Sequence, residues 1–158
     1  MNKKIDAVNS AVAKMFAKVS VEQVVDKLVN KVNKTKEKQG NTLVNDSISI
    51  KVSEDFKIKI DYDVVGYIYL IDYKLYEKNT KGKYWECDGY YIDGIKETDL
   101  CEVLQKYICK YIEWCLSFYE ESIICYENRK DMEYVRTKSI ESWNYLTGLD
   151  YFEFNKVE

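Results

Sequence analysis

Three residues in the middle of the chain, Asp63, Asp72 and Lys74, have the types and spacing needed for metal-dependent cleavage of nucleic acid. Carboxylates hold Mg²⁺, and a lysine beside the attacked phosphate stabilises its developing charge. An Asp-x-Lys sequence places both side chains on one face of a strand, because strand side chains alternate. Asp55 and Lys57 repeat this spacing, so an ion pair in solvent is the competing interpretation.

This spacing loosely resembles the nuclease pattern of an acid followed by an acid-x-Lys pair, and a metal-dependent nuclease is therefore one hypothesis. The residues that other classes of catalytic site require are missing from the chain. The chain has no histidine, which removes Ser-His and Cys-His nucleophiles. It also has no glycine-rich phosphate loop. We therefore expect a protein that is not an enzyme and that needs no cofactor.

A second group of candidate residues lies in the first forty positions, where nine lysines accompany four acids. At helical spacing, four of these lysines share one face, which could lie along a phosphate backbone. Arginine and base-stacking aromatics are lacking, so base recognition is not supported. A solvated helix face and non-specific polyanion binding are the two interpretations. The stripe consists of Lys27, Lys31, Lys34 and Lys38.

Cysteine usage and apolar runs bear on the compartment. The cysteines are odd in number and form no Cys-x-x-Cys pair, which favours free thiols in a reducing compartment and no zinc site. No run of about twenty apolar residues occurs, and Asp6, Asn9 and Lys14 interrupt any signal-peptide core. We expect a cytoplasmic protein with no metal and no membrane contact. The cysteines are Cys87, Cys101, Cys109, Cys115 and Cys125.

Charge and aromatic residues are divided unequally along the chain. Residues 1–40 carry a net charge of +5, whereas all fifteen tyrosines lie at or beyond Tyr62, in segments that are acidic. Tyrosine is enriched at protein interfaces, and an acidic face with tyrosines suits a basic partner, either a protein or a ribonucleoprotein. Tyrosines that only fill a core are the alternative. The predicted partner-binding residues are Tyr84, Glu86, Asp88, Tyr90 and Asp93.

Residues 1–39 are predicted to form a basic, amphipathic helical leader. Apolar residues recur in steps of three and four along two seams that are out of register, which favours two short helices, with one helix whose faces serve two different neighbours as the alternative. Ser20 with Gln23 has the form of a capping box that starts the second helix, and Gly40 ends it. Pairing of two copies through these seams is a third hypothesis. The predicted oligomerisation residues are Ile5, Val8, Val12, Met15, Val19, Val21, Val25, Leu28 and Val32.

After Gly40 the apolar period changes to two, which predicts a four-stranded antiparallel meander within residues 43–92. A hairpin loop at 53–55 joins the first two strands. The third strand has two partly apolar faces, which predicts an interior strand covered on both sides for half its length. The fourth is predicted to place Trp85, Cys87 and Tyr91 on one face. The predicted strands are 48–52, 56–62, 65–76 and 83–92.

The C-terminal part is predicted to be helical. A broad apolar stripe predicts a long helix over 99–127 that packs on the sheet, and a shorter helix follows over 131–147. The aromatic tail 149–154 could add an edge strand, dock, or anchor a partner. The expected fold is therefore α+β, with the leader 1–39 followed by a body over 41–158.

The function expected first is non-enzymatic protein binding, in which an acidic, tyrosine-rich surface occupies a partner protein. Small phage or mobile-element inhibitors of bacterial defence and immunity-type proteins act in this way, and the chain shares their size and acidity. The nuclease or nucleic-acid-binding accessory protein and the oligomeric assembly protein remain as alternatives.

Overall fold

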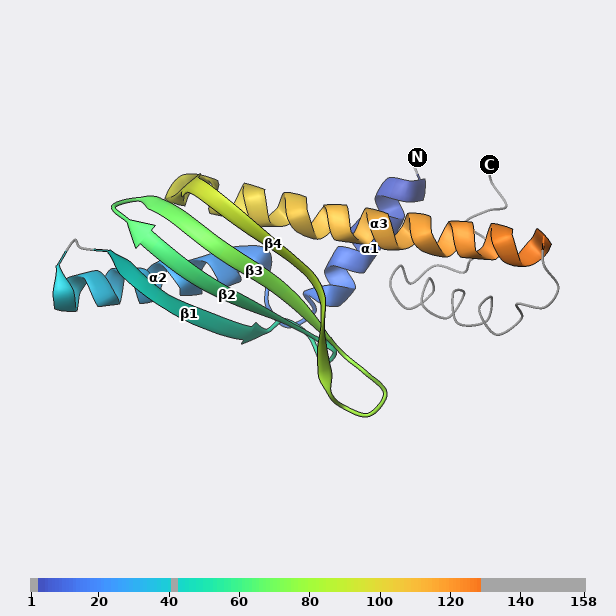
Figure 1. Cartoon of the computed structure of the whole chain (residues 1–158), viewed down its shortest axis with the longest axis horizontal. Coiled ribbons are helices and arrows are strands. Elements are labelled where there is room, and N and C mark those ends of the chain that lie inside the picture. Colours follow the sequence, from blue (N-terminus) through green and yellow to red (C-terminus); the bar gives the residue numbers. More distant parts are fainter. Residues whose placement is uncertain (1–2, 41–42, 129–158) are drawn as a thin grey trace. The chain divides into compact units, whose positions relative to one another are not determined.

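The computed structural model describes residues 3–40 and 43–128, which fold into helices and one antiparallel sheet (Figure 1). The predicted α+β class is confirmed, with helix before and after a four-stranded sheet. The predicted helix at 131–147 and the tail at 149–154 lie outside the described residues. The elements are α1 (Lys3–Met15), α2 (Val21–Gln39), β1 (Val44–Lys51), β2 (Phe56–Val65), β3 (Ile68–Lys78), β4 (Tyr84–Lys96), a 3₁₀ turn (Glu97–Asp99) and α3 (Leu100–Asn128).

The chain divides into two compact units, and the division does not fall at Gly40. Residues 15–107 form the sheet unit, which contains α2, all four strands and the first turns of α3. The second unit contains residues 1–14 and the chain from Ile108 onward. α2 therefore belongs to the same unit as the sheet, and the division into a leader 1–39 and a body 41–158 stays a prediction.

Two separate helices replace a continuous leader, as predicted. α1 ends at Met15, and α2 begins after a complete capping box. The Ser20 hydroxyl accepts a hydrogen bond from the Gln23 amide at 3.2 Å, and the Gln23 side chain accepts one from the Ser20 amide at 2.9 Å. Gly40 ends α2 at φ 83°, where its amide donates to the Lys36 carbonyl.

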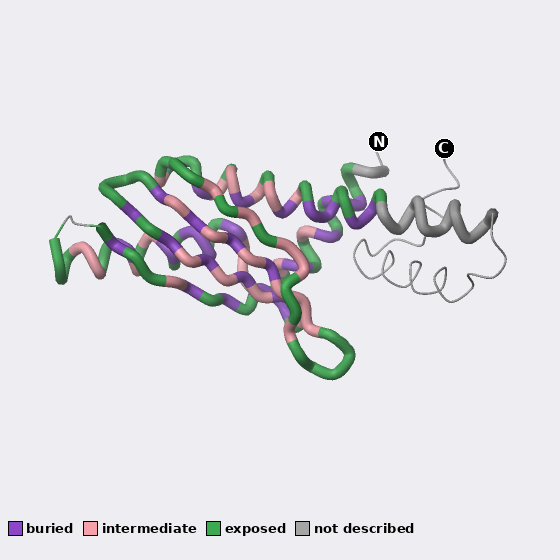
Figure 2. Tube along the Cα trace, in the orientation of Figure 1, coloured by how far each residue is buried: buried purple, intermediate pink, exposed green. Residues whose placement is uncertain are grey.

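The four strands form an antiparallel meander in the order β1-β2-β3-β4. One sheet face is the core face, which α2 and the start of α3 cover. There Lys31 of α2 donates to the Ser47 carbonyl at 2.6 Å, and the Tyr107 ring of α3 lies 4.4 Å from that of Tyr90. Figure 2 shows the alternation of buried and partly exposed residues along β2 and β3. The fully buried core-face residues include Ile58, Ile60, Ile71, Tyr73 and Leu75.

The opposite face of the sheet, which we call the open face, is not covered by any described element of the sheet unit. It carries the odd-numbered residues of β2 and the even-numbered residues of β3, all of them half-buried or exposed. The prediction that the third strand is covered on both sides is therefore wrong for the described residues. Leu70 is only half-buried, and Ile68 is 40% exposed.

The third strand also begins later than predicted. Val65 pairs with Ile68, so Gly66 and Tyr67 form a two-residue loop between β2 and β3. Gly66 has φ 62°, as a tight hairpin with glycine first requires. The turn reverses the parity of the alternation: Val65 shares the open face with Ile68, whereas Tyr69 is buried on the core face, so Val65 and Tyr69 do not share a face, contrary to the prediction. Tyr67 is instead 72% exposed.

The prediction that Trp85, Cys87 and Tyr91 share a face is wrong. Asp88 pairs with Leu75 and Glu86 pairs with Tyr76, so Cys87 is an extra residue in β4. A bulge of this kind shifts the side-chain alternation by one residue. Trp85 therefore falls on the side of the core face and Tyr91 on the open face, opposite Asp72.

Candidate binding surface on the open face

The open face is built from rows of residues that pair across the strands. In one row, Ser47 pairs with Asp61, Asp61 with Asp72, and Asp72 with Tyr91. In the next row, toward the start of β2, Lys59 pairs with Lys74. The boundary between negative and positive charge therefore runs across the strands, between these two rows.

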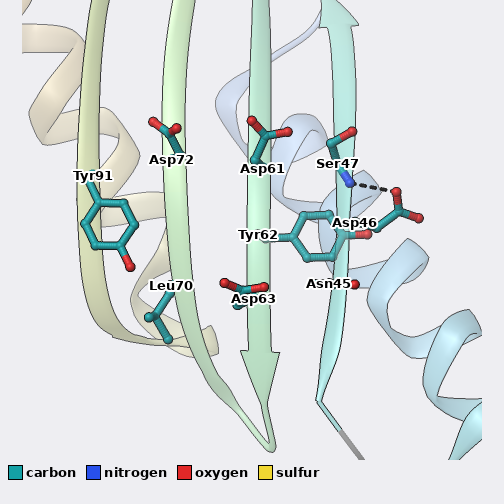
Figure 3. A pocket seen from close by; sticks show the side chains of 9 residues that line it. All are labelled: Asn45, Asp46, Ser47, Asp61, Tyr62, Asp63, Leu70, Asp72 and Tyr91. Atoms are coloured by element: carbon teal, nitrogen blue, oxygen red, sulfur yellow. Dashed lines mark hydrogen bonds between the residues drawn. The ribbon is translucent and has the colours of Figure 1, made fainter.

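The acidic half of the open face consists of Asp61, Asp63 and Asp72, with Tyr91 beside them. Figure 3 shows Asp61 and Asp72 side by side on neighbouring strands, with Asp63 on the same face as Asp61. These residues line an open depression of about 370 Å³. Tyr91 is 68% exposed, so the depression has a large aromatic ring at one side.

The lysine half of the open face consists of Lys57, Lys59 and Lys74. The ammonium of Lys57 lies 5.3 Å from the ring centre of Tyr76 and 4.4 Å from that of Tyr84, which fits cation–π contact with both rings. Lys74 lies 3.5 Å from a carboxylate oxygen of Glu86. That carboxylate, and next Asp72, raises the pKa of Lys74.

Like charges stand directly opposite each other in both halves. Carboxylates face each other at Asp61 and Asp72, and ammonium groups at Lys59 and Lys74. Directly opposed like charges destabilise an antiparallel pair, whereas opposite charges contribute roughly 0.2 to 1 kcal/mol. Exchanging the charges of Asp72 and Lys74 would give two favourable pairs. The observed arrangement thus disfavours the isolated sheet and concentrates each sign for an external charge.

The residues of the nuclease hypothesis do share the open face. Asp63 pairs with Leu70, one row away from Asp72, and Lys74 is engaged with Glu86. Among the described residues, no three carboxylate or thiol side chains are grouped so that they could hold a metal ion. Sequence reasoning missed Asp61, which is the carboxylate directly opposite Asp72. The signal that could have found it is the two-residue Gly66–Tyr67 loop, which sets the register of β2 on β3.

The predicted partner-binding set is divided between the two sides of β4. Tyr84 and Glu86 pair with Lys78 and Tyr76 on the open face. After the bulge at Cys87, Asp88 and Tyr90 pair with Leu75 and Tyr73, which belong to the core face. Asp93 is exposed near a second irregularity in the β3–β4 pairing. These five residues do not form one surface.

The lysine stripe of α2 is partly neutralised by the sheet. Lys31 bonds the Ser47 carbonyl and lies 3.3 Å from a carboxylate oxygen of Asp46. The Ser47 amide, and then Lys31, lowers the pKa of Asp46. Lys27, Lys34 and Lys38 are exposed. Three lysines of the stripe are therefore exposed, and the fourth, Lys31, is half-buried and engaged with β1.

Most of the predicted oligomerisation residues are buried in the chain itself. The α2 seam packs into the sheet unit, with Val21, Val25, Leu28 and Val32 all at most 7% exposed. These side chains are consequently not available to a second copy in the folded chain. In the first seam, Val8 and Met15 are buried, Val12 and Val19 are half-buried, and Ile5 is 56% exposed.

Two buried polar groups lie on the core face, one on β3 and one on β4. The Tyr73 hydroxyl and the Asp88 Oδ2 atom are both buried, and neither has a hydrogen-bond partner among the described residues. Burial raises the pKa of the Asp88 carboxyl. Burial also raises the pKa of Tyr73, with the nearby Asp88 as the next cause. By contrast, the equally buried Tyr69 donates to a Glu97 oxygen at 2.9 Å.

The described cysteines and helices bear on disulfide bonds and on membrane spans. Four of the cysteines are not in disulfide bonds, and the side chain of Cys125 lies outside the described residues. Within residues 3–40 and 43–128, no helix combines the length and apolar content needed to cross a membrane. The four cysteines outside disulfide bonds are Cys87, Cys101, Cys109 and Cys115. Comparison with protein-family models, with curated proteins and with solved structures finds no match to this chain.

Proposed function

We propose that the protein is a non-enzymatic binding module that occupies a basic partner protein through the acidic half of its open face. The observation that carries this proposal is the placement of Asp61 directly opposite Asp72 on a sheet face that no described element of the sheet unit covers. A pair of opposed carboxylates repel each other in the free protein, and a cationic partner group between them relieves that repulsion. The free energy of binding therefore includes the relief of a repulsion that already destabilises the free protein.

The surroundings of this pair support a protein partner. Tyr91 offers a large, exposed aromatic side chain beside the carboxylates, and tyrosine is among the residues that most often anchor interfaces. The acidic half repels nucleic acid, although a ribonucleoprotein could bind through a basic protein component. Occupation without chemical turnover is the mode of action of inhibitors and immunity-type proteins, including those carried by phages or mobile elements.

A matched pair of double variants tests the proposal in affinity capture from extracts of the source cells. In the first, Asp61→Asn is combined with Asp72→Asn on the open face. In the control, Asp6→Asn is combined with Glu22→Gln on exposed helix positions, so the net charge changes equally. We expect one basic protein to be retained by the wild type and the control and lost from the first variant.

Titration of that purified partner makes the test quantitative. Removing both carboxylates is expected to weaken binding at least tenfold at low salt, and raising the ionic strength should weaken the wild type in the same direction. Ribonuclease treatment of the extract separates a protein from a ribonucleoprotein. A partner that binds the first variant as tightly as the control would contradict the proposal.

A further inference from the structure

We propose that, without a partner, two copies of this chain pack their open faces together about a two-fold axis that runs across the strands. This inference goes beyond the proposed function, because it assigns a second occupant to the open face. In this arrangement the acidic half of each copy covers the lysine half of the other. The partner protein would then have to displace a second copy.

The charge order along the strands carries the inference. Along the open face of β2 the residues are Lys57, Lys59, Asp61 and Asp63. β3 runs in the opposite direction and pairs Asp72 with Asp61 and Lys74 with Lys59. The signs of β2 and β3 therefore coincide, so these two strands have one negative and one positive end, and Glu86 of β4 lies beside Lys74 at the positive end.

Symmetry allows two ways to join such a face to its copy. A two-fold axis parallel to the strands would place like ends together. The two aspartates nearest the centre would then face the aspartates of the second copy, and the two lysines would face its lysines. An axis across the strands exchanges the ends, so Asp61 faces the second copy's Lys59 and Asp72 faces its Lys74. Each contact then occurs twice, as an isologous interface requires.

Side-chain size is complementary under the same operation. The axis superimposes each strand on its own copy, so Tyr91 of one β4 faces Gly89 of the other. Tyr91 is a large, 68% exposed ring, whereas Gly89, opposite Lys74, adds no side chain of its own. The nearest side chains beside Gly89 are Lys74 and Glu86. One row further out, Leu70 faces the second copy's Tyr76, which pairs two apolar surfaces.

The size of the face sets the expected strength. Four strands about 4.8 Å apart and four rows about 6.6 Å apart give a patch of roughly 500 Å² per copy. The total of about 1,000 Å² lies at the lower limit for a specific interface. We therefore expect a dimer with a dissociation constant on the order of 10 to 100 μM, which weakens strongly as salt is added.

Charge exchange provides the decisive experiment on the purified full chain, followed by sedimentation equilibrium at 50 mM and 500 mM NaCl. One variant combines Asp61→Lys with Asp72→Lys, and the other combines Lys59→Asp with Lys74→Asp. Each alone should be monomeric, and their equimolar mixture should form a heterodimer. Wild-type protein that stays monomeric at 500 μM in 50 mM NaCl, or a mixture that fails to associate, would overturn the inference.

A milder variant protects the test against misfolding of the charge-exchanged proteins. Tyr91→Ser removes the exposed ring and should weaken the wild-type dimer at least tenfold. Tyr67→Ser is the matched control, because Tyr67 is 72% exposed but lies in the β2–β3 loop. Equal dimerisation of the two variants would overturn the inference. So would a dimer that Ile5→Lys dissociates, because Ile5 lies on α1.

Purified protein contains no partner, so this experiment and the capture experiment fail independently. A monomeric wild type that still retains a basic protein through Asp61 and Asp72 would remove the dimer and leave the proposed function. If the wild type dimerises but the Asp61 and Asp72 variants retain the same proteins as the wild type, the dimer stands and the proposed function is removed.

Discussion

At the scale of single residues, two tyrosines that are equally buried in β3 differ in how their hydroxyl groups are satisfied. Tyr69 donates to Glu97, whereas the Tyr73 hydroxyl has no partner among the described residues. A buried polar group without a partner costs about 1 to 3 kcal/mol, and a hydrogen bond to a charged group stabilises by a similar amount. Two substitutions that each remove one oxygen atom should therefore have opposite effects.

We expect Tyr73→Phe to raise the free energy of unfolding by about 1 kcal/mol and Tyr69→Phe to lower it by about 1 to 2 kcal/mol. Urea denaturation followed by far-ultraviolet circular dichroism measures both, and the two variants control each other for aromatic packing. Equal losses in both variants would mean that the Tyr73 hydroxyl is satisfied in solution.

The neighbouring carboxyl predicts a pH dependence. Because burial raises the pKa of Asp88, the folded protein binds the Asp88 proton more tightly than the unfolded chain does. The contribution of this group to stability is therefore fully present below the ordinary aspartate pKa and is lost as pH rises through the raised value. We expect Asp88→Asn to raise the melting temperature at pH 7 by on the order of 2 °C and to leave it nearly unchanged at pH 3.5.

The control for this prediction is Asp93→Asn on the same strand, because Asp93 is exposed and its removal changes the net charge equally. The two variants are compared by thermal denaturation between pH 3.5 and pH 8. If Asp93→Asn shifts the melting temperature as much as Asp88→Asn does, the effect comes from net charge and not from burial.

At the scale of elements, α2 is an integral layer of the sheet unit. Its apolar seam, centred on the fully buried Leu28, lies against the core face of the sheet, and its Lys31 is tied to β1. From the sequence, the positive charge of this segment nevertheless led us to predict a leader separate from the body. Composition differs between α2 and the strands, but composition does not decide which surfaces bury each other.

We expect Leu28→Ala to lower the free energy of unfolding of the sheet unit by about 2 to 4 kcal/mol, because it leaves a cavity between helix and sheet. The matched control is Leu43→Ala, since Leu43 is 56% exposed and its removal should change stability by less than about 0.5 kcal/mol. Guanidinium denaturation of the full chain gives both values. A small effect at Leu28 would show that α2 is only loosely attached.

The register of the strands is set by one loop and one bulge. The two-residue loop at Gly66–Tyr67 determines which residues of β2 and β3 face each other, and it places Asp61 opposite Asp72. The bulge at Cys87 then changes which β4 side chains reach the open face. The first feature has a sequence signal, a glycine between two alternating runs. The second arises from pairing with β3 and has none.

At the scale of the whole molecule, the net charge of −3 conceals the arrangement that matters. The open face is nearly balanced in charge, yet its two halves have opposite signs. A balanced surface of this kind is attracted to a surface with the same order of charges running the other way. Both proposals use this property, since the partner takes the acidic half alone and the second copy takes both halves.

Much of the architecture followed from the sequence itself. The period of two predicted the strands, and the capping box at Ser20 and Gln23 predicted where α2 begins, because both depend on interactions within a few residues. The meander order followed from the short connections. These features are local, so a chain read residue by residue contains the information that specifies them.

Only the tertiary structure decided which sheet face is buried and which residues meet on the other. α2 and the start of α3 cover the core face, and that choice leaves Asp61, Asp72, Lys59 and Lys74 together on the open face. The physical reason is that burial and cross-strand register depend on residues distant in sequence, whereas alternation depends only on neighbours. The binding surface is a product of that packing, and no single segment of the chain contains it.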